Sequence, residues 1–268
     1  MAVRSFIAGL QAAGAAFQLL TRIPVPVQIP FTRDVLARSV AAYPLVGAAI
    51  GLLTAAAGWL LQGAIPSMPA AVITLLVWVA LTGALHLDGL MDTADGVLSH
   101  RSRERMLEIM KDSRVGAMGV IAAVILLLLK FSLLAELLGA GAMTSVAPHL
   151  AAACMWSRLW MAASMIFWPN ARGNEGLGGM FAGVAGRHIA GAVIVHTFIL
   201  FGIYAAFGYS LIEAGIWFAA GAAVTLLAGG ACGWWLSRKL GGLTGDTYGA
   251  MNELLEAALL LAACACMM

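Results

Sequence analysis

Charged side chains are scarce in this sequence. Asp, Glu, Lys and Arg make up 10% of its 268 residues, whereas hydrophobic residues make up 62%. A soluble domain carries about a quarter charged residues and just under half apolar ones. The composition therefore excludes soluble, disordered and nucleic-acid-binding proteins and predicts an integral membrane protein whose partner is the lipid bilayer. The formal net charge of +2 adds little, because fifteen Lys and Arg nearly balance thirteen Asp and Glu.

Cysteine is also rare, and its pattern excludes two kinds of stabilising site. The four cysteines lie within apolar stretches and have no Cys-x-x-Cys spacing, so neither a disulfide framework nor a zinc site is expected. The first apolar stretch runs into Thr21-Arg22-Ile23-Pro24 without an Ala-x-Ala cleavage site at its end. We therefore expect the N-terminus to be retained rather than removed as a signal peptide.

Long apolar runs account for most of the chain. A helix of about 20 mostly apolar residues crosses a bilayer, and seven segments reach this length: 40–62, 69–87, 116–138, 142–168, 189–209, 213–236 and 249–268. The shorter stretch 6–20 is compatible with a short span or with an interfacial helix. We predict an all-α fold, a polytopic membrane helical bundle with about seven transmembrane helices plus a short N-terminal helix. Residues 1–268 would form a single transmembrane catalytic domain.

Basic residues are absent from every second connection between these segments. The connections near 63–68, 139–141 and 209–210 contain no Lys or Arg, whereas the four other loops are basic. Cytoplasmic loops are enriched in Lys and Arg, so we expect the basic loops to face the cytoplasm. Most acidic residues lie on the same side. The sequence thus predicts a multi-pass protein of the cytoplasmic (inner) membrane with its active site facing the cytoplasm.

The densest acidic run is His86 to Gly96, HLDGLMDTADG. Asp88, Asp92 and Asp95 stand at positions i, i+4 and i+7, which places all three on one face of a helix. Three like charges at a membrane boundary repel one another, and this arrangement is costly without a cation. Carboxylate oxygens without cysteine favour a hard ion, so the run predicts Mg²⁺, with Mn²⁺ as the alternative.

A second acidic run follows within 104–112. Glu104, Glu108 and Asp112 are again spaced for one side of a helix. A helical hairpin would bring Glu108 and Asp112 opposite Asp92 and Asp95, giving four carboxylates around one or two metal ions. For Glu104, pairing with a neighbouring arginine at the surface is the preferred interpretation.

The third constellation is the glycine-rich segment 241–250, GGLTGDTYGA. Its backbone N–H groups could cradle a phosphate, although Asp246, Glu253 and Glu256 would repel one unless a metal ion or cations intervene. Carboxylates inside a span are functional candidates by default, and we assign Glu253 to substrate binding. The cations expected to hold phosphate oxygens are Arg22, Lys111 and Arg114. For Lys130, deep in its span, snorkelling or pairing with Glu136 and a functional role stay open.

Several of these motifs occur together in one known family. The sequence resembles the adenosylcobinamide-GDP ribazoletransferases, or cobalamin synthases, through the following segments in order: Thr21–Pro26 (TRIPVP), Tyr43–Gly47 (YPLVG), His86–Gly96 (HLDGLMDTADG), Met106–Gly119 (MLEIMKDSRVGAMG), Glu175–Gly178 (EGLG) and Gly241–Gly249 (GGLTGDTYG). The resemblance spans nearly the whole chain, which makes it more specific than any single motif.

The resemblance implies the last assembly step of the corrinoid pathway. Adenosylcobinamide-GDP and α-ribazole, or its 5′-phosphate, would give adenosylcobalamin, or its 5′-phosphate, plus GMP, with Mg²⁺ required. In such a reaction a ribose hydroxyl attacks the β-phosphorus of a diphosphate, which needs charge neutralisation and little covalent help. The hypothesis gives the metal role to Asp92, Asp95, Glu108 and Asp112. It makes Asp88 or Asp246 the base or a second metal ligand. A homo-oligomer is compatible with this interpretation.

Two alternatives stay open from the sequence. Asp92-x-x-Asp95-Gly96 followed by Glu108-x-x-x-Asp112 also resembles part of the signature of CDP-alcohol phosphotransferases, but the Ala-Arg pair of that signature is missing. A cation-coupled transporter would instead place carboxylates at the bilayer midplane and show inverted halves, and neither pattern is visible. The corrin ring, too large for the bilayer interior, is expected to dock near the glycine-rich loop 169–188, around Asn174, Glu175 and Gly178.

Overall fold

The structure, a computed structural model, describes residues 2–173 and 175–267, without the side chains of 2–6 and 177. Over these residues it is all-helical, which confirms the predicted class. The elements in chain order are α1 (Ala2–Leu20), α2 (Arg33–Ser39), the 3-10 turn η1 (Val40–Ala42), α3 (Tyr43–Leu61), α4 (Ser67–Thr82), α5 (Leu85–Val97), α6 (Arg103–Ile109), α7 (Ala117–Gly139), α8 (Met143–Phe167), α9 (Gly176–Met180), α10 (Gly186–Ala206), α11 (Leu211–Val224), the π-helical turn η2 (Thr225–Gly229), α12 (Gly230–Leu240) and α13 (Gly245–Met267).

The predicted number of spans is confirmed. Among the described residues, 6 helices are long and apolar enough to cross a membrane, or up to 7 when the bent pair α4 and α5 counts as one span. The predicted span 69–87 is broken, because α4 and α5 meet at an angle of 88°. Gly83 and Ala84 at the break have positive φ angles of 62° and 58°. Glycine adopts this backbone conformation freely, so the chain turns here and presents α5 as a separate, polar helix.

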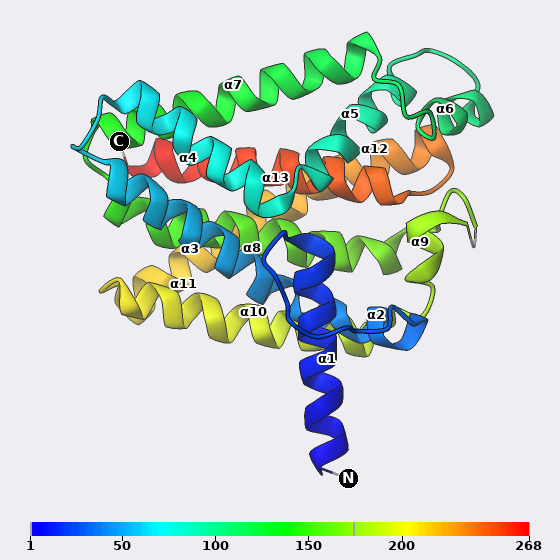
Figure 1. Cartoon of the computed structure of the whole chain (residues 1–268), viewed down its shortest axis with the longest axis horizontal. Coiled ribbons are helices and arrows are strands. Elements are labelled where there is room, and N and C mark those ends of the chain that lie inside the picture. The colour runs from blue at the N-terminus through cyan, green and yellow to red at the C-terminus, as the bar shows by residue number, and fades with distance from the viewer. Residues whose placement is uncertain (1, 174, 268) are drawn as a thin grey trace.

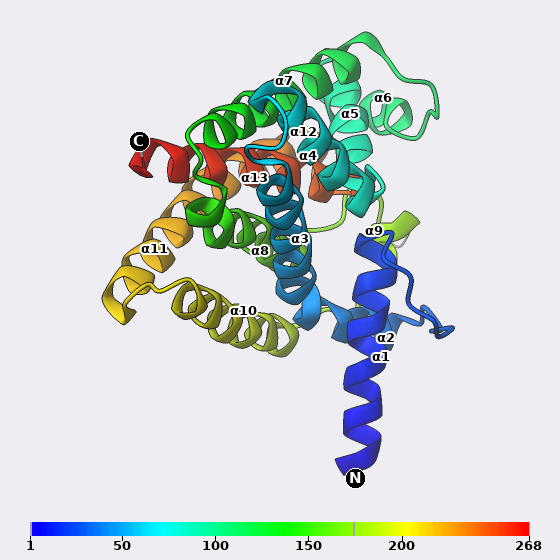
Figure 2. The ribbon, with the colours of Figure 1, turned by 60° about the vertical axis from the view of Figure 1, so that its left-hand side comes forward.

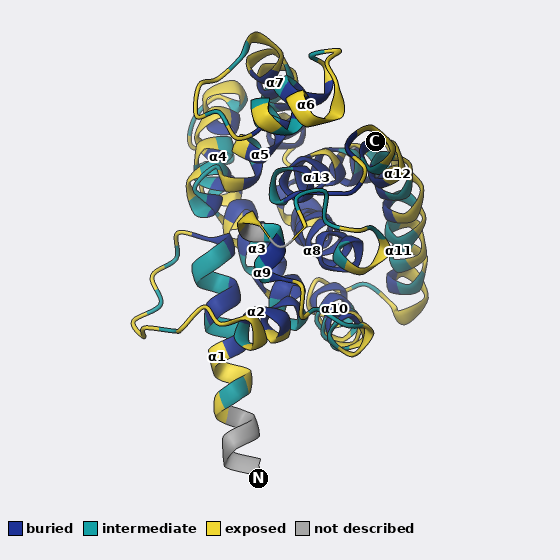
Figure 3. Ribbon diagram, turned by 90° about the vertical axis from the view of Figure 1, so that its right-hand side faces the viewer, coloured by how far each residue is buried: buried dark blue, intermediate teal, exposed yellow. Residues whose placement is uncertain are grey.

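Helix α8 forms the centre of the bundle. Of the spanning helices it is among the most enclosed, with 83% of its apolar window buried, and Figure 3 shows it surrounded by α3, α10, α11 and α13. Gly47 and Gly51 of α3 lie directly against the α8 backbone, where a Cβ on Gly51 would meet the Cα of Ala151 at 2.5 Å. Small residues allow helices to approach closely in lipid, where packing rather than water drives association.

Helix α1 is only half packed. Its C-terminal part buries Ala12, Ala15, Ala16 and Leu20, whereas its N-terminal half projects away from the other helices in Figures 1 and 2. The apolar part, Ile7–Leu20, is shorter than a spanning helix. Only the C-terminal part of α1 therefore contributes to the core.

The two ends of the bundle differ in their loops. Figure 1 shows α2, α6, α9 and the turn between α12 and α13 at one end, and the α10–α11 connection with the C-terminus at the other. The first end carries the basic loops, and the other end carries the connections without Lys or Arg. Helix α5 runs toward the basic end, and α6 and the start of α13 lie there (Figure 1).

Candidate active site

Two of the sequence motifs lie face to face, because α5 crosses α13 at glycines. A Cβ on Gly89 would lie 2.7 Å from the carbonyl oxygen of Asp246, and one on Gly249 would lie 3.1 Å from the backbone of His86. Contacts this short leave no room for any side chain. The glycines of HLDG and GDTYG therefore serve to bring the two polar helix segments together.

This crossing gathers carboxylates from both helices. The Asp92 side chain is within electrostatic range of Asp88, Asp95 and Asp246, and Arg172 is a cation that acts on it. Within the described residues neither Asp88 nor Asp92 forms an ion pair. The predicted face of α5 is thus present, and α13 contributes a further acidic group to it.

Arg172 belongs to this site, although the sequence suggests only a basic loop residue. Its Nη2 lies 3.0 Å from Oδ2 of Asp246, and both side chains are mostly buried. The loop is held in place by two backbone bonds, in which Ala171 N donates to Leu243 O and Leu243 N donates to Pro169 O, each 2.8 Å long. The glycine-rich turn before α13 is therefore attached to the loop that carries Arg172.

Asp95 has a structural task that its spacing does not reveal. Its carboxylate accepts hydrogen bonds from Gly116 N at 2.7 Å and from Gly119 N at 2.8 Å, at the start of α7. These N–H groups lack partners within α7, and a carboxylate at a helix N-terminus satisfies them and the helix dipole. Asp95 therefore caps α7.

The structure does not bring the second half of the expected four-carboxylate arrangement, Glu108 and Asp112, to the acidic face. Helix α6 does pack on α5, but Met106 and the following Met110 are its buried residues, and the Met110 side chain and the Met106 carbonyl oxygen lie against Gly96. Glu108 consequently points outward, where it pairs with Arg105 at 2.7 Å. The apolar residues at i and i+4 decide which side of α6 is buried.

Two of the three expected phosphate-binding cations, Lys111 and Arg114, are already paired, and so is Asp112. Helix α6 ends at Ile109, before Asp112, which binds Arg114 at 2.6 Å. These hydrogen bonds from Arg114 lower the pKa of Asp112 to about 2. Lys111 pairs with Glu175 at 3.2 Å.

Arg22 lies against Gly83, at the break between α4 and α5. Its backbone N–H donates to Leu81 O at 2.8 Å. Arg22 is therefore fixed beside the first turn of α5. Asn174, expected near the corrin ring, lies outside the described residues.

No preformed cage for a metal ion is found in the part of the chain that the structure describes: it contains no group of three or more His, Cys, Asp or Glu side chains close enough to hold one. The acidic face of α5 and α13 thus offers carboxylates that are near one another without converging on a single point.

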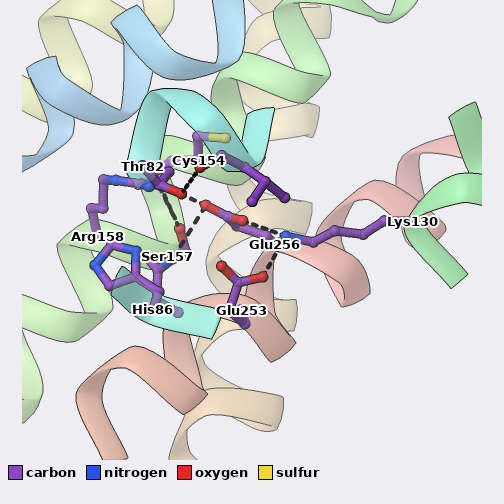
Figure 4. A network of polar contacts seen from close by, with 10 residues as sticks. Thr82, His86, Lys130, Cys154, Ser157, Arg158, Glu253 and Glu256 are labelled. Carbon is purple, nitrogen blue, oxygen red and sulfur yellow. Dashed lines mark hydrogen bonds and ion pairs between the residues drawn. The ribbon is translucent and has the colours of Figure 1, made fainter. Parts of the chain in front are cut away.

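A buried ion network lies below this face, inside the bundle (Figure 4). Lys130 Nζ is 2.7 Å from both Glu253 and Glu256, and Arg158 Nη1 is 2.7 Å from Glu256. Lys130 neither snorkels nor pairs with Glu136, because it is 3% exposed and also lies over the ring of Trp78. Two cations balance two anions, as burial requires.

Glu253 therefore lies in this network and not in a substrate cavity. Its side chain is 7% exposed and its carboxylate is bound by Lys130. The position of Glu253 does not support its assignment to substrate binding. Arg158 was not singled out by the sequence analysis. The sequence feature that indicates its role is the presence of Lys130 and Arg158 in apolar spans together with two glutamates, because charged residues inside a membrane usually pair with one another.

A cavity of about 110 Å³ adjoins the acidic face. Asp88 and Asp246 form part of its wall, and His86 lines it as well. The rest of the wall is mainly apolar or glycine, from Leu19, Leu20, Tyr43, Leu85, Gly89, Met161, Met165, Gly178, Phe181, Gly245, Tyr248 and Gly249. A molecule bound there would contact mainly apolar side chains and glycines, together with the side chains of His86, Asp88 and Asp246.

Fold and site together define a polytopic helical membrane protein with an acidic site at one end of its bundle. The family model described as cobalamin-5-phosphate synthase matches residues 12–264. The chain belongs to this family, which confirms the resemblance found in the motifs.

Individual relatives agree with the family match. A protein of Brevibacillus brevis named adenosylcobinamide-GDP ribazoletransferase is 40% identical over 261 residues, covering 92% of this chain and 94% of its own length. Proteins with the same name from Escherichia coli K12 and Roseiflexus sp. are 40% and 39% identical, with 92% and 91% of this chain and 97% and 85% of their own lengths covered. No solved structure matches the chain.

Proposed function

We propose that this protein is the adenosylcobinamide-GDP ribazoletransferase of a cytoplasmic membrane. It joins adenosylcobinamide-GDP to α-ribazole, or to its 5′-phosphate, and releases GMP. The observation that carries the proposal is the acidic face formed where α5 crosses α13, in a chain that belongs to the cobalamin-5-phosphate synthase family. The basic loops at that end support a site that faces the cytoplasm.

The bond changes are those of a phosphoryl transfer. A ribose hydroxyl oxygen forms a bond to the phosphorus that carries the cobinamide, and the bond from this phosphorus to the GMP oxygen breaks. GMP leaves with the electron pair of that bond. The hydroxyl proton passes to Asp88, which has no ion pair among the described residues, whereas Asp246 is engaged by Arg172.

The donor set suits Mg²⁺ even without a three-ligand cage. This ion usually keeps several waters and takes one or two protein carboxylates together with substrate phosphates. Asp92 and Asp246, with Asp95 nearby, would hold one or two ions, Mn²⁺ being an alternative. When bound, Mg²⁺ would neutralise charge on the diphosphate. We assign no metal role to Glu108 and Asp112, because their carboxylates pair with arginines at the surface.

Cations at the site would position the diphosphate. Arg172 is the best placed, since its guanidinium already binds an oxyanion, the carboxylate of Asp246. A guanidinium can also hold two phosphate oxygens at once. Arg22, fixed beside the first turn of α5, would assist it. Lys111 and Arg114 would first have to leave Glu175 and Asp112.

The test is an assay of purified protein in nanodiscs that follows GMP release from adenosylcobinamide-GDP. We expect GMP and a cobalamin only when α-ribazole and Mg²⁺ are both present, and no product with EDTA. A matched reaction with a CDP-alcohol should give no CMP. Release of CMP, or no turnover by folded protein with any divalent ion, would contradict the proposal.

A further inference from the structure

The basic end of the bundle carries cations that the proposed reaction does not use. Arg103 begins α6, and Arg238 and Lys239 lie in the last turn of α12. All three residues are exposed, and none of them forms an ion pair within the described residues. Glu104, next to Arg103 in the chain, offsets part of this charge without an ion pair. The three cations, which we call the α6–α12 patch, therefore keep an excess of positive charge.

Packing between α6 and α12 brings the cations of the patch together. The guanidinium of Arg103 lies directly over Gly241, so closely that a Cβ on Gly241 would overlap it. Gly241 is the left-handed C-cap residue of α12, and it follows Arg238 by three residues, which is about one helical turn. The carbonyl end of α12 attracts these cations, but they still repel one another. An anion bound between them would remove this repulsion.

The surface that adjoins the patch is apolar and aromatic. Helices α11 and α12 form one candidate span, Leu211–Leu240, and only 17% of its apolar window is buried. Trp234 and Trp235, near the end of this span, are 56% and 40% exposed. Cζ of Arg238 lies 5.1 Å from the ring centre of Trp234, and Nζ of Lys239 lies 6.0 Å from that of Trp235. Exposed tryptophans mark the level at which acyl chains meet headgroups, so the patch lies at the headgroup level.

We propose that the α6–α12 patch binds the phosphate of an anionic phospholipid whose acyl chains lie along the exposed face of α12 and η2. Basic clusters at the ends of membrane spans recognise such headgroups. Arg103 and Arg238 supply the charge, and a guanidinium can hold two phosphate oxygens at once. Leu226 and Leu227 of η2, which lie further along the same span, are 62% and 74% exposed and offer an apolar surface to the chains.

A water-soluble anion, such as a nucleotide, fits these observations less well. It would account for the charge of Arg103 and Arg238. It would not account for two exposed tryptophans under the cations, or for an apolar face that continues from them along the span. The cavity beside the acidic face also takes none of its lining residues from α6 or α12. The patch therefore belongs to the lipid-facing surface of the bundle.

A phosphate held between α6 and α12 would join the two elements that support the acidic face. Helix α6 packs on α5, where the Met110 side chain lies against Gly96. Helix α12 leads through the turn 241–244 into α13. Asp92 lies on α5 and Asp246 on α13, so a lipid that restrains α6 and α12 also restrains the surroundings of both carboxylates. We therefore expect anionic lipid to stabilise the fold in the absence of any substrate.

The first experiment measures lipid binding to detergent-purified protein by native mass spectrometry, with phosphatidylglycerol and phosphatidylcholine of equal chain length. We expect wild-type protein to bind the first phosphatidylglycerol on the order of tenfold more tightly than phosphatidylcholine. The double variant Arg103→Gln/Arg238→Gln should lose this preference. The matched control Arg33→Gln/Arg187→Gln removes two exposed cations from other loops and should keep it. A wild type without the preference, a patch variant that keeps it, or an equal loss in the control would overturn the proposal.

The second experiment compares thermal unfolding in nanodiscs made of either lipid. Wild-type protein should melt about 5 °C or more higher in phosphatidylglycerol than in phosphatidylcholine, and Arg103→Gln/Arg238→Gln should melt at the same temperature in both. Adding glycerol 3-phosphate to the phosphatidylcholine nanodiscs should not raise the midpoint. A shift of full size there would assign the patch to a water-soluble phosphate and overturn the lipid proposal. No substrate is present, so the result is independent of whether the protein releases GMP.

Discussion

The buried ion network makes a stability prediction for Glu256→Gln. In wild-type protein the Glu256 carboxylate accepts from Lys130 and Arg158, each at 2.7 Å, and from Asn252 at 3.2 Å. Glutamine keeps the volume of the side chain but removes its charge. The two buried cations would then have a single carboxylate in the network, that of Glu253. This carboxylate pairs with Lys130 and leaves Arg158 without an ion pair.

The expected loss is large because Arg158 is fully buried and would have no anion within the described residues. Removing one partner of a buried ion pair costs about 3–5 kcal/mol. For a chain of this size such a change lowers the melting temperature by roughly 10 °C. The measurement is thermal unfolding in detergent, followed by tryptophan fluorescence.

Two further variants control this prediction. Glu136→Gln removes an exposed carboxylate on the same helix as Lys130, and we expect a change within about 0.5 kcal/mol. Adding Arg158→Met to Glu256→Gln removes one charge of each sign, so the double variant should melt above Glu256→Gln alone. A wild-type melting temperature for Glu256→Gln, or a double variant as unstable as the sum of its parts, would refute the reasoning.

Three other predictions concern the site and its support. Arg172→Lys keeps the charge but loses the planar guanidinium. The KM for adenosylcobinamide-GDP should therefore rise about tenfold or more, while the KM for α-ribazole stays constant. An unchanged KM for adenosylcobinamide-GDP would exclude Arg172 from the diphosphate site. Gly89→Ala should lower turnover at least about tenfold, because its Cβ would lie 2.7 Å from Asp246 O; activity equal to that of the control Gly202→Ala would contradict this. Asp95→Ala should cost about 0.5–2 kcal/mol in the same melting assay, by loss of the α7 cap, and an unchanged midpoint would count against the cap.

The fold was largely predictable from sequence because the bilayer imposes simple rules. Apolar length predicted the spans, and the basic loops do gather at one end of the bundle. The break at Gly83 and Ala84 was missed, because the hydropathy of an apolar segment is the same whether or not its backbone turns. The positive φ angles of Gly83 and Ala84, and the close packing of Arg22 on Gly83, are not reported by hydropathy.

The candidate site was predicted only in part. Helical spacing identified the acidic face of α5, since this face depends on local geometry. For α6 the same spacing does not report which side is buried: Met106 and Met110 are buried, and Glu108 faces outward and pairs with Arg105. Arg172 escaped notice because its partner, Asp246, is far away in sequence. Long-range partners of this kind follow from packing and not from spacing.

The most direct test of the central claim compares two carboxylate variants in the nanodisc assay of GMP release. Asp92 belongs to the acidic face of α5 and α13, whereas Glu108 points outward and pairs with Arg105. We predict that Asp92→Asn loses at least about a thousandfold in turnover, as expected when a charged group that supports the transferring phosphoryl group is removed, while Glu108→Gln keeps wild-type activity. Turnover by Asp92→Asn at the wild-type rate, or an equal loss in both variants, would contradict the account.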